Sequence, residues 1–161
     1  THTVPGHLPK DVLGLTIGAA AAGGWIAVTG SFAPTAYALW AGVGLWIAGF
    51  DILYATQDYT FDRAHGVKSI PARFGIPQAL RVARASHLLA WLAFLWAGVS
   101  YGAGPLYYLG LLLVGGLLLL EHRLVSPEDL SKVEVAFFQA NVGVSLGMFL
   151  FIVLDLLARG A

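Results

Sequence analysis

Long apolar runs alternate with short polar segments along the whole chain. The runs lie at roughly 11–30, 35–56, 77–101, 105–121 and 135–157. Each is close to the ~20 residues that a helix needs to cross a bilayer. Pro34, Pro77 and Pro105 stand at or near the starts of three runs, where proline suits a first helical turn because its missing N–H would have no partner there. The pattern predicts an all-α, multi-pass transmembrane bundle of five helices in a single domain, residues 1–161.

The composition agrees with a membrane protein. Hydrophobic residues make up 58% of the chain and charged residues only 11%, whereas a soluble domain is about 25% charged. The absence of cysteine excludes disulfides, thiolate catalysis and cysteine-based metal sites. The first residues, "THTVPGHLPKD", show neither an initiator methionine nor a signal-peptide layout, so we expect the chain to be cut from a longer one.

Basic residues indicate the orientation in the membrane. Eight of the nine Lys and Arg residues fall before the first run, in the two longer loops or in the first turns of the third run, and only Arg159 lies at the other side. Short cytoplasmic loops collect Lys and Arg. We therefore predict a cytoplasmic N-terminus, two cytoplasmic loops and a C-terminus outside.

Three aspartates follow the second apolar run in the segment "DILYATQDYTFD". On a helix of about 100° per residue, Asp51, Asp58 and Asp62 fall within roughly 40° of one another, with Tyr54 about 60° away. If the helix continues through this segment, the four side chains form one stripe from the membrane interior to its cytoplasmic edge. A carboxylate at the depth of Asp51 costs at least ~2.5 kcal/mol on insertion scales and faces a cavity or a partner.

The chemistry of this segment suits a metal and a phosphate. Carboxylates without cysteine match Mg²⁺, and Asp58 and Asp62, one turn apart, can share such an ion. The next residues, "RAHGVKSIPARFG", place Arg63, Lys68 and Arg73 where they can bind a phosphate or diphosphate. Two other readings remain open: the carboxylates can pair with an arginine of a neighbouring helix, and basic residues at a membrane edge can simply anchor topology.

The segment "GFDILYATQDYTFDRAHGVKSIPARFG" resembles the second aspartate-rich motif, D-x-x-Y-A-x-x-D-x-x-x-D, of the UbiA family of intramembrane prenyltransferases. "WIAVTGSF" and "FFQANVGVSLGMFLFIVLDLL" resemble later helices of its bacterial 4-hydroxybenzoate polyprenyltransferase branch, which includes menaquinone-pathway members. The family fold has nine helices and an earlier motif, N-D-x-x-D-x-x-x-D, which this sequence lacks. The chain thus corresponds to the last five helices.

The resemblance implies Mg²⁺-dependent transfer of a polyprenyl group from prenyl diphosphate to an aromatic acceptor such as 4-hydroxybenzoate, in ubiquinone or menaquinone biosynthesis. It implies Mg²⁺ on Asp58 and Asp62, with Asp51 and Tyr54 shaping the site where cation and ring meet. The expected partners are prenyl diphosphate, an aromatic acid and membrane lipid, with no nucleic acid, and the implied location is a bacterial inner membrane. The missing first motif would come from an N-terminal half, in cis or in trans.

The same basic residues acquire a role through this resemblance. Arg63, Lys68 and Arg73 would bind the diphosphate. Two other functions stay open. Asp51 could be the proton or cation site of a small carrier, and His87 with His122 could hold a haem in a non-catalytic subunit. A hydrogen-bonded histidine pair at the membrane edge is the simpler expectation for the last two residues.

Overall fold

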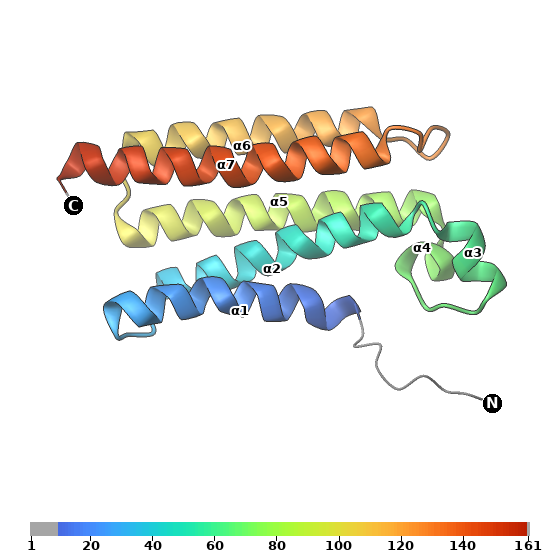
Figure 1. Ribbon diagram of the computed structural model, residues 1–161, viewed down its shortest axis with the longest axis horizontal. Coiled ribbons are helices and arrows are strands. Elements are labelled where there is room, and N and C mark those ends of the chain that lie inside the picture. The colour runs from blue at the N-terminus through green and yellow to red at the C-terminus, as the bar shows by residue number, and fades with distance from the viewer. Residues whose placement is uncertain (1–9, 161) are drawn as a thin grey trace.

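The computed structural model describes residues 10–160, with side chains from residue 15 onward, and in this part of the chain the regular structure is entirely helical. Seven helices follow one another (Figure 1): α1 Lys10–Thr29, α2 Pro34–Ala55, α3 Tyr59–Ala64, α4 Ile70–Phe74, α5 Ile76–Tyr101, α6 Pro105–Leu124 and α7 Val133–Arg159. The five long helices match the five predicted ones to within a few residues. The two short helices, α3 and α4, were not predicted, because they lie in a polar segment without an apolar period.

The helix ends follow from local chemistry. Proline occupies the first turn of α2, α5 and α6, where its missing N–H leaves no bond unmade. At the other end of α5, Gly102 adopts a left-handed conformation with φ of 72°. Glycine takes that conformation without the steric penalty of a side chain, so the chain can reverse there and enter α6.

The long helices lie roughly alongside one another (Figure 1). The start of α1 and the loops 56–75 and 125–132 gather at one end, whereas the loops 30–33 and 102–104 and the C-terminal end of α7 lie at the other. Among the described residues, four helices are long and apolar enough to cross a membrane, namely α2, α5, α6 and α7. The chain is therefore a multi-pass membrane protein. The described apolar part of α1, Leu15–Thr29, is shorter, so the fifth crossing stays a prediction.

Small residues let α2 and α5 approach closely. Ala36 and Ala38 of α2 and Ala79 and Ala83 of α5 are fully buried. A side-chain carbon added at Gly42 of α2 would lie only 2.7 Å from the Phe94 ring of α5. Membrane helices pack through such small residues because lipid supplies no hydrophobic drive between them.

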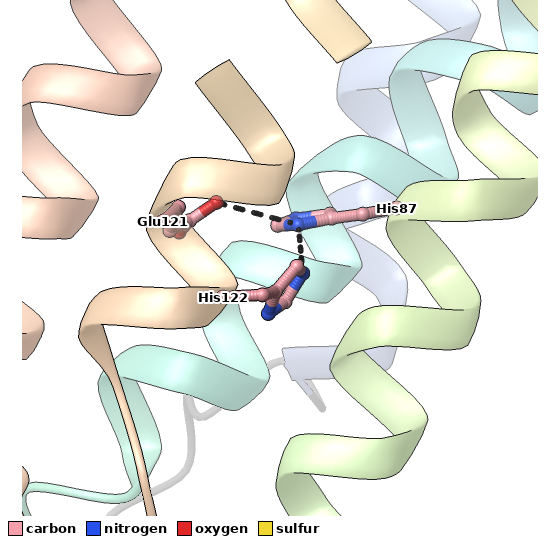
Figure 2. Close-up of side chains that lie close together, drawn as sticks. All are labelled: His87, Glu121 and His122. Carbon is pink, nitrogen blue, oxygen red and sulfur yellow. Dashed lines mark hydrogen bonds and ion pairs between the residues drawn. The ribbon is translucent and has the colours of Figure 1, made fainter. Parts of the chain in front are cut away.

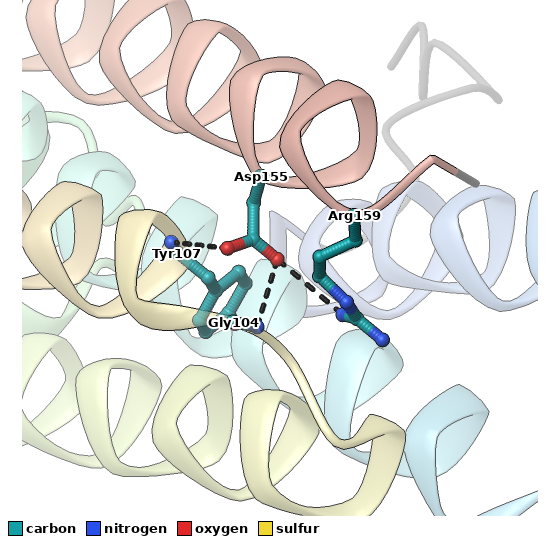
Figure 3. Close-up of polar contacts among 4 residues, drawn as sticks. All are labelled: Gly104, Tyr107, Asp155 and Arg159. Atoms are coloured by element: carbon teal, nitrogen blue, oxygen red, sulfur yellow. Dashed lines mark hydrogen bonds and ion pairs between the residues drawn. The ribbon is translucent and has the colours of Figure 1, made fainter.

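A buried aspartate of α7 caps the start of α6 (Figure 3). Asp155 accepts hydrogen bonds from the backbone N–H groups of Gly104, at 2.8 Å, and Tyr107, at 3.3 Å. Arg159, one turn further along α7, donates to the same carboxylate at 3.4 Å. The first N–H groups of a helix have no partner within the helix. Asp155 therefore satisfies the start of α6 and ties it to α7.

We expect Asp155→Ala to lower the midpoint of thermal unfolding, since two backbone N–H groups would lose their acceptor inside the bundle. Asp155→Asn, which keeps one carboxamide oxygen, should lower the midpoint less. Circular dichroism in detergent measures both. Glu128→Ala, in the exposed loop before α7, is the control and should leave the midpoint unchanged. Equal midpoints for Asp155→Ala and the unmodified chain would contradict the capping role.

Candidate active site

The predicted acidic segment does not form one continuous helix. Helix α2 ends at Ala55. The Thr56 hydroxyl donates to the Leu53 carbonyl at 2.6 Å, and the N–H groups of Thr56 and Gln57 bond three residues back instead of four. A threonine side chain that bonds nearby backbone competes with the helix in this way. The prediction of a single stripe was therefore wrong: Asp51 and Tyr54 belong to α2, whereas Asp58 directly precedes α3 and Asp62 lies within it.

Two turns fold the segment after α2 back on itself. At Gly66, with φ of 68°, the chain leaves α3, and the Val67 N–H bonds the Asp62 carbonyl at 2.9 Å, as in a Schellman motif. The turn brings Lys68 back toward Asp62. The Ser69 hydroxyl then accepts the Ala72 N–H at 3.3 Å and caps α4, the helix that carries Arg73.

These turns enclose a pocket of about 420 Å³. It is lined by Asp62, Arg63, Gly66, Val67, Lys68, Ala72 and Arg73. Asp62 is only 4% exposed, and its Oδ2 atom is buried without a hydrogen-bond partner. We call this the loop pocket. It combines one buried carboxylate with three basic side chains.

The basic side chains of the loop pocket are available for an anion. In the described part of the chain, the ion pairs join other residues, and neither Arg63, Lys68 nor Arg73 takes part in one. Arg63 donates to the Tyr59 hydroxyl at 2.9 Å, and the Arg73 guanidinium lies over the Phe74 ring at 5.2 Å. The loop pocket therefore presents unneutralised positive charge, which suits a phosphate or diphosphate.

The donor set also fits Mg²⁺. A buried carboxylate oxygen without a hydrogen bond needs a partner, and a hard divalent cation with water and phosphate ligands supplies one for Asp62. Asp58 lies one helical turn earlier, since the Asp62 N–H bonds the Asp58 carbonyl at 2.8 Å. Asp58 is exposed and does not line the loop pocket, so it faces solvent and any ligand that enters from there.

Asp51 and Tyr54 lie apart from the loop pocket. Asp51 is half-buried on α2, and the Tyr54 side chain is 47% exposed. The Tyr54 ring packs on Phe137 of α7 at 5.4 Å, and Phe137 in turn contacts Phe50 of α2 at 5.4 Å. The sequence alone did not indicate this aromatic contact between α2 and α7, nor the hydrogen bond from Arg63 to Tyr59.

A second cavity, of about 320 Å³, lies at the opposite end of the bundle. Its lining is mainly apolar and includes Trp25, Leu39, Tyr101 and Ile152. Its one acidic residue, Asp155, already caps α6. This cavity offers no basic group for an anion, so the loop pocket is the candidate site.

The histidine pair forms a direct hydrogen bond. His87 Nδ1 of α5 and His122 Nε2 of α6 are 3.0 Å apart (Figure 2). A haem held by both residues would need the two nitrogens on opposite faces of its flat ring, and nitrogens in direct hydrogen-bonded contact leave no space for that ring. The structure therefore shows the simpler of the two expectations, a hydrogen-bonded histidine pair. Sequence reasoning missed Glu121, which lies beside both rings.

The fold and the loop pocket define a multi-pass helical membrane protein with a pocket of three basic side chains and one buried carboxylate at one end of its helices. Residues 6–152 match the UbiA prenyltransferase family, and the chain belongs to this family. The resemblance of the sequence to that family is thereby confirmed.

Curated relatives of the chain share one description. A "4-hydroxybenzoate octaprenyltransferase" of Methylococcus capsulatus is 35% identical over 89% of this chain and 50% of the relative. A protein of the same name from Nitrosospira multiformis is 31% identical over 96% of this chain and 52% of the relative. The chain therefore spans about half the length of the curated relatives it matches.

A solved structure has the same fold. The apo structure of a UbiA homolog from Aeropyrum pernix K1 superposes with a TM-score of 0.78 and 30% sequence identity. The superposition covers 92% of this chain and 55% of that one. The helical arrangement is therefore shared with a larger member of the family.

Proposed function

We propose that the chain carries the diphosphate-binding half of an Mg²⁺-dependent aromatic prenyltransferase. The reaction is transfer of a polyprenyl group from prenyl diphosphate to an aromatic acid such as 4-hydroxybenzoate, in ubiquinone or menaquinone biosynthesis. The loop pocket carries the proposal, because a buried carboxylate with an unbonded oxygen lies beside three basic side chains that form no ion pair among the described residues. The names of the relatives support the acceptor.

The loop pocket residues would act on the leaving group. Arg63, Lys68 and Arg73 would donate hydrogen bonds to the diphosphate oxygens, and Asp62 would provide a carboxylate ligand for Mg²⁺. Asp58, one turn earlier and outside the pocket lining, would provide a second carboxylate from the solvent side. Bound Mg²⁺ would neutralise the negative charge that develops on the diphosphate. The allylic C–O bond breaks, and its electron pair leaves with the diphosphate, so the prenyl carbon becomes a cation.

The next step forms a carbon–carbon bond. The ring carbon ortho to the acceptor's hydroxyl attacks the cation, and the proton on that carbon then leaves. Asp51 and Tyr54, further along α2 toward the membrane interior, would line the place where cation and ring meet, and Asp51 would accept the proton or stabilise the positive charge. The apolar helices would exclude water, which would otherwise quench the cation.

The proposed reaction also needs the N-terminal half of the family fold. The first aspartate-rich motif would come from an N-terminal segment in cis or in trans, consistent with a chain that spans about half of its relatives. The end that carries the loop pocket would face the cytoplasm and the C-terminus would face outward, because eight of the nine basic residues lie at the loop-pocket end.

A reconstitution assay tests this function. The chain is expressed in membranes alone and together with the N-terminal half of the Methylococcus capsulatus relative, and product is measured from labelled prenyl diphosphate and 4-hydroxybenzoate. We expect product with both halves and Mg²⁺, and none after chelation by EDTA. Failure of both halves together would contradict the proposal. Ion flux through liposomes, without binding of prenyl diphosphate, would instead support the carrier function built on Asp51.

We expect Arg73→Ala to raise the KM for prenyl diphosphate about tenfold, since a charge-assisted hydrogen bond contributes roughly 1.5 kcal/mol. Initial rates over a range of prenyl diphosphate concentrations measure this change. The matched control is Arg81→Ala on α5, whose guanidinium donates to Gln78 and does not line the loop pocket. An equal rise of KM in both variants would show a general charge effect and would contradict a specific role for Arg73.

A further inference from the structure

We propose that His87, Glu121 and His122 form a binding site for a divalent transition-metal ion of the zinc class. One nitrogen from each histidine and one carboxylate oxygen all lie within 4.8 Å of one another (Figure 2). The three residues come from α5 and α6 and take no part in the proposed prenyl transfer.

The carboxylate of this cluster lacks the partners that its position requires. Glu121 is 2% exposed, and both of its oxygens are buried without a hydrogen bond. Its Oε2 atom lies 3.5 Å from His87 Nδ1, without hydrogen-bond geometry. A carboxylate left unsatisfied inside a membrane helix bundle is costly and marks a functional site by default. A cation between Glu121 and the histidines removes that cost.

His87 is held in the tautomer that a metal ligand needs. Its Nε2 atom lies 3.3 Å from the backbone carbonyl of Trp46 on α2, which can only accept a hydrogen bond. Nε2 therefore carries the proton, and Nδ1 presents a lone pair toward Glu121 and His122. Histidine ligands of metals are oriented in this way by a carbonyl on the other ring nitrogen.

The distances match a small ion after modest side-chain rotation. Bonds of about 2.0–2.2 Å in a tetrahedral site place ligand atoms roughly 3.3–3.6 Å apart. The observed separations are 3.0 Å between the two histidine nitrogens and 3.5 Å from His87 to Glu121. Two imidazoles and one carboxylate favour Zn²⁺ and similar ions over Mg²⁺. Three protein ligands leave the fourth position for water or an anion.

The position of the cluster gives the ion a structural consequence. Helices α6 and α7 run side by side, next to α5 (Figure 1). His87 belongs to α5, whereas Glu121 and His122 are consecutive residues of α6. The Arg84 guanidinium of α5 also donates to the His122 carbonyl at 3.4 Å. A bound ion would therefore fasten α6 to α5 close to the end where the loop pocket lies.

Metal analysis of the purified chain tests this site. The chain is prepared without a polyhistidine tag, stripped with a chelator and titrated with Zn²⁺, and with Co²⁺ as a spectroscopic probe. We expect one ion per chain, visible absorption bands of tetrahedral Co²⁺, and a rise of the thermal midpoint with Zn²⁺. Glu121→Gln and His122→Gln, both close in size to the native residues, should each weaken Zn²⁺ binding at least tenfold and abolish the rise.

Controls separate this site from the other histidines and from the loop pocket. A variant with His2, His7 and His65 all changed to alanine should bind Zn²⁺ as the unmodified chain does, and so should Asp62→Asn. The proposal is overturned if the unmodified chain binds no Zn²⁺, if its Co²⁺ spectrum lacks tetrahedral bands, or if Glu121→Gln binds Zn²⁺ equally well. If Glu121 is protonated and holds no metal ion, the unmodified chain will bind no Zn²⁺, and the proposal is overturned.

Discussion

Asp62→Asn is expected to reduce prenyl transfer about a hundredfold or more. The substitution keeps the size of the side chain but removes the negative charge that the proposed Mg²⁺ needs, and stabilisation of transition-state charge by a metal amounts to several kcal/mol, where about 2.7 kcal/mol already corresponds to a hundredfold. Asp62 is the acidic residue that lines the loop pocket, and its Oδ2 atom has no hydrogen bond to lose. Initial rates in the two-half assay, measured over a range of Mg²⁺ concentrations, report the effect.

The control for Asp62→Asn is Asp129→Asn. Asp129 lies in the other loop at the same end, is exposed, and accepts hydrogen bonds from the Ser131 N–H and hydroxyl. The prenyl-transfer rate of Asp129→Asn should equal that of the unmodified chain. The thermal midpoint of Asp62→Asn should not fall, because Oδ2 accepts no hydrogen bond that the change could break. A normal rate in Asp62→Asn would remove the loop pocket from the reaction.

Gly49→Ala should destabilise the bundle by about 1–3 kcal/mol, the usual cost of overpacking a tight core. A side-chain carbon at Gly49 of α2 would overlap the His87 ring of α5. The ring also contacts Phe50, bonds Trp46 and faces His122. Since these contacts surround His87, its ring cannot move aside without losing some of them. Denaturant unfolding in detergent, followed by circular dichroism, measures the change.

Gly116→Ala on α6 is the matched control. Nothing lies within 4 Å of a side-chain carbon added at Gly116, and alanine is favoured over glycine in a helix by about 0.5–1 kcal/mol. Gly116→Ala should therefore be neutral or slightly stabilising. If both variants lose the same stability, the loss is a general effect of replacing a helix glycine in this bundle, and the close approach of Gly49 to His87 is not the cause.

The long helices could be predicted because each depends on information within itself. An apolar run of the right length and a proline in the first turn were enough to locate α2, α5 and α6. The end of α2 was harder to predict. The Thr56 hydroxyl bonds the Leu53 carbonyl, a local competition that helical periodicity does not register, and the predicted stripe was wrong for this reason.

Some features of the candidate site could likewise be predicted from the sequence, and others could not. Asp62, Arg63, Lys68 and Arg73 could be proposed from the spacing of charges, and the structure brings them to one pocket. The burial of Asp62 could not be predicted, since it depends on how α3, α4 and the Gly66 turn fold together. Glu121 was missed because an acidic residue near a helix end usually reaches water, and only the packing of α6 against α5 reveals it as buried.

Every residue that lines the loop pocket comes from positions 62–73. Bringing together residues that are close in sequence costs little loop-closure entropy. We therefore expect this segment to fold before the distant helices assemble. The pocket is in this sense modular. If the chain binds diphosphate as proposed, we expect that binding to depend on this segment alone, so that substrate binding and turnover can be lost separately.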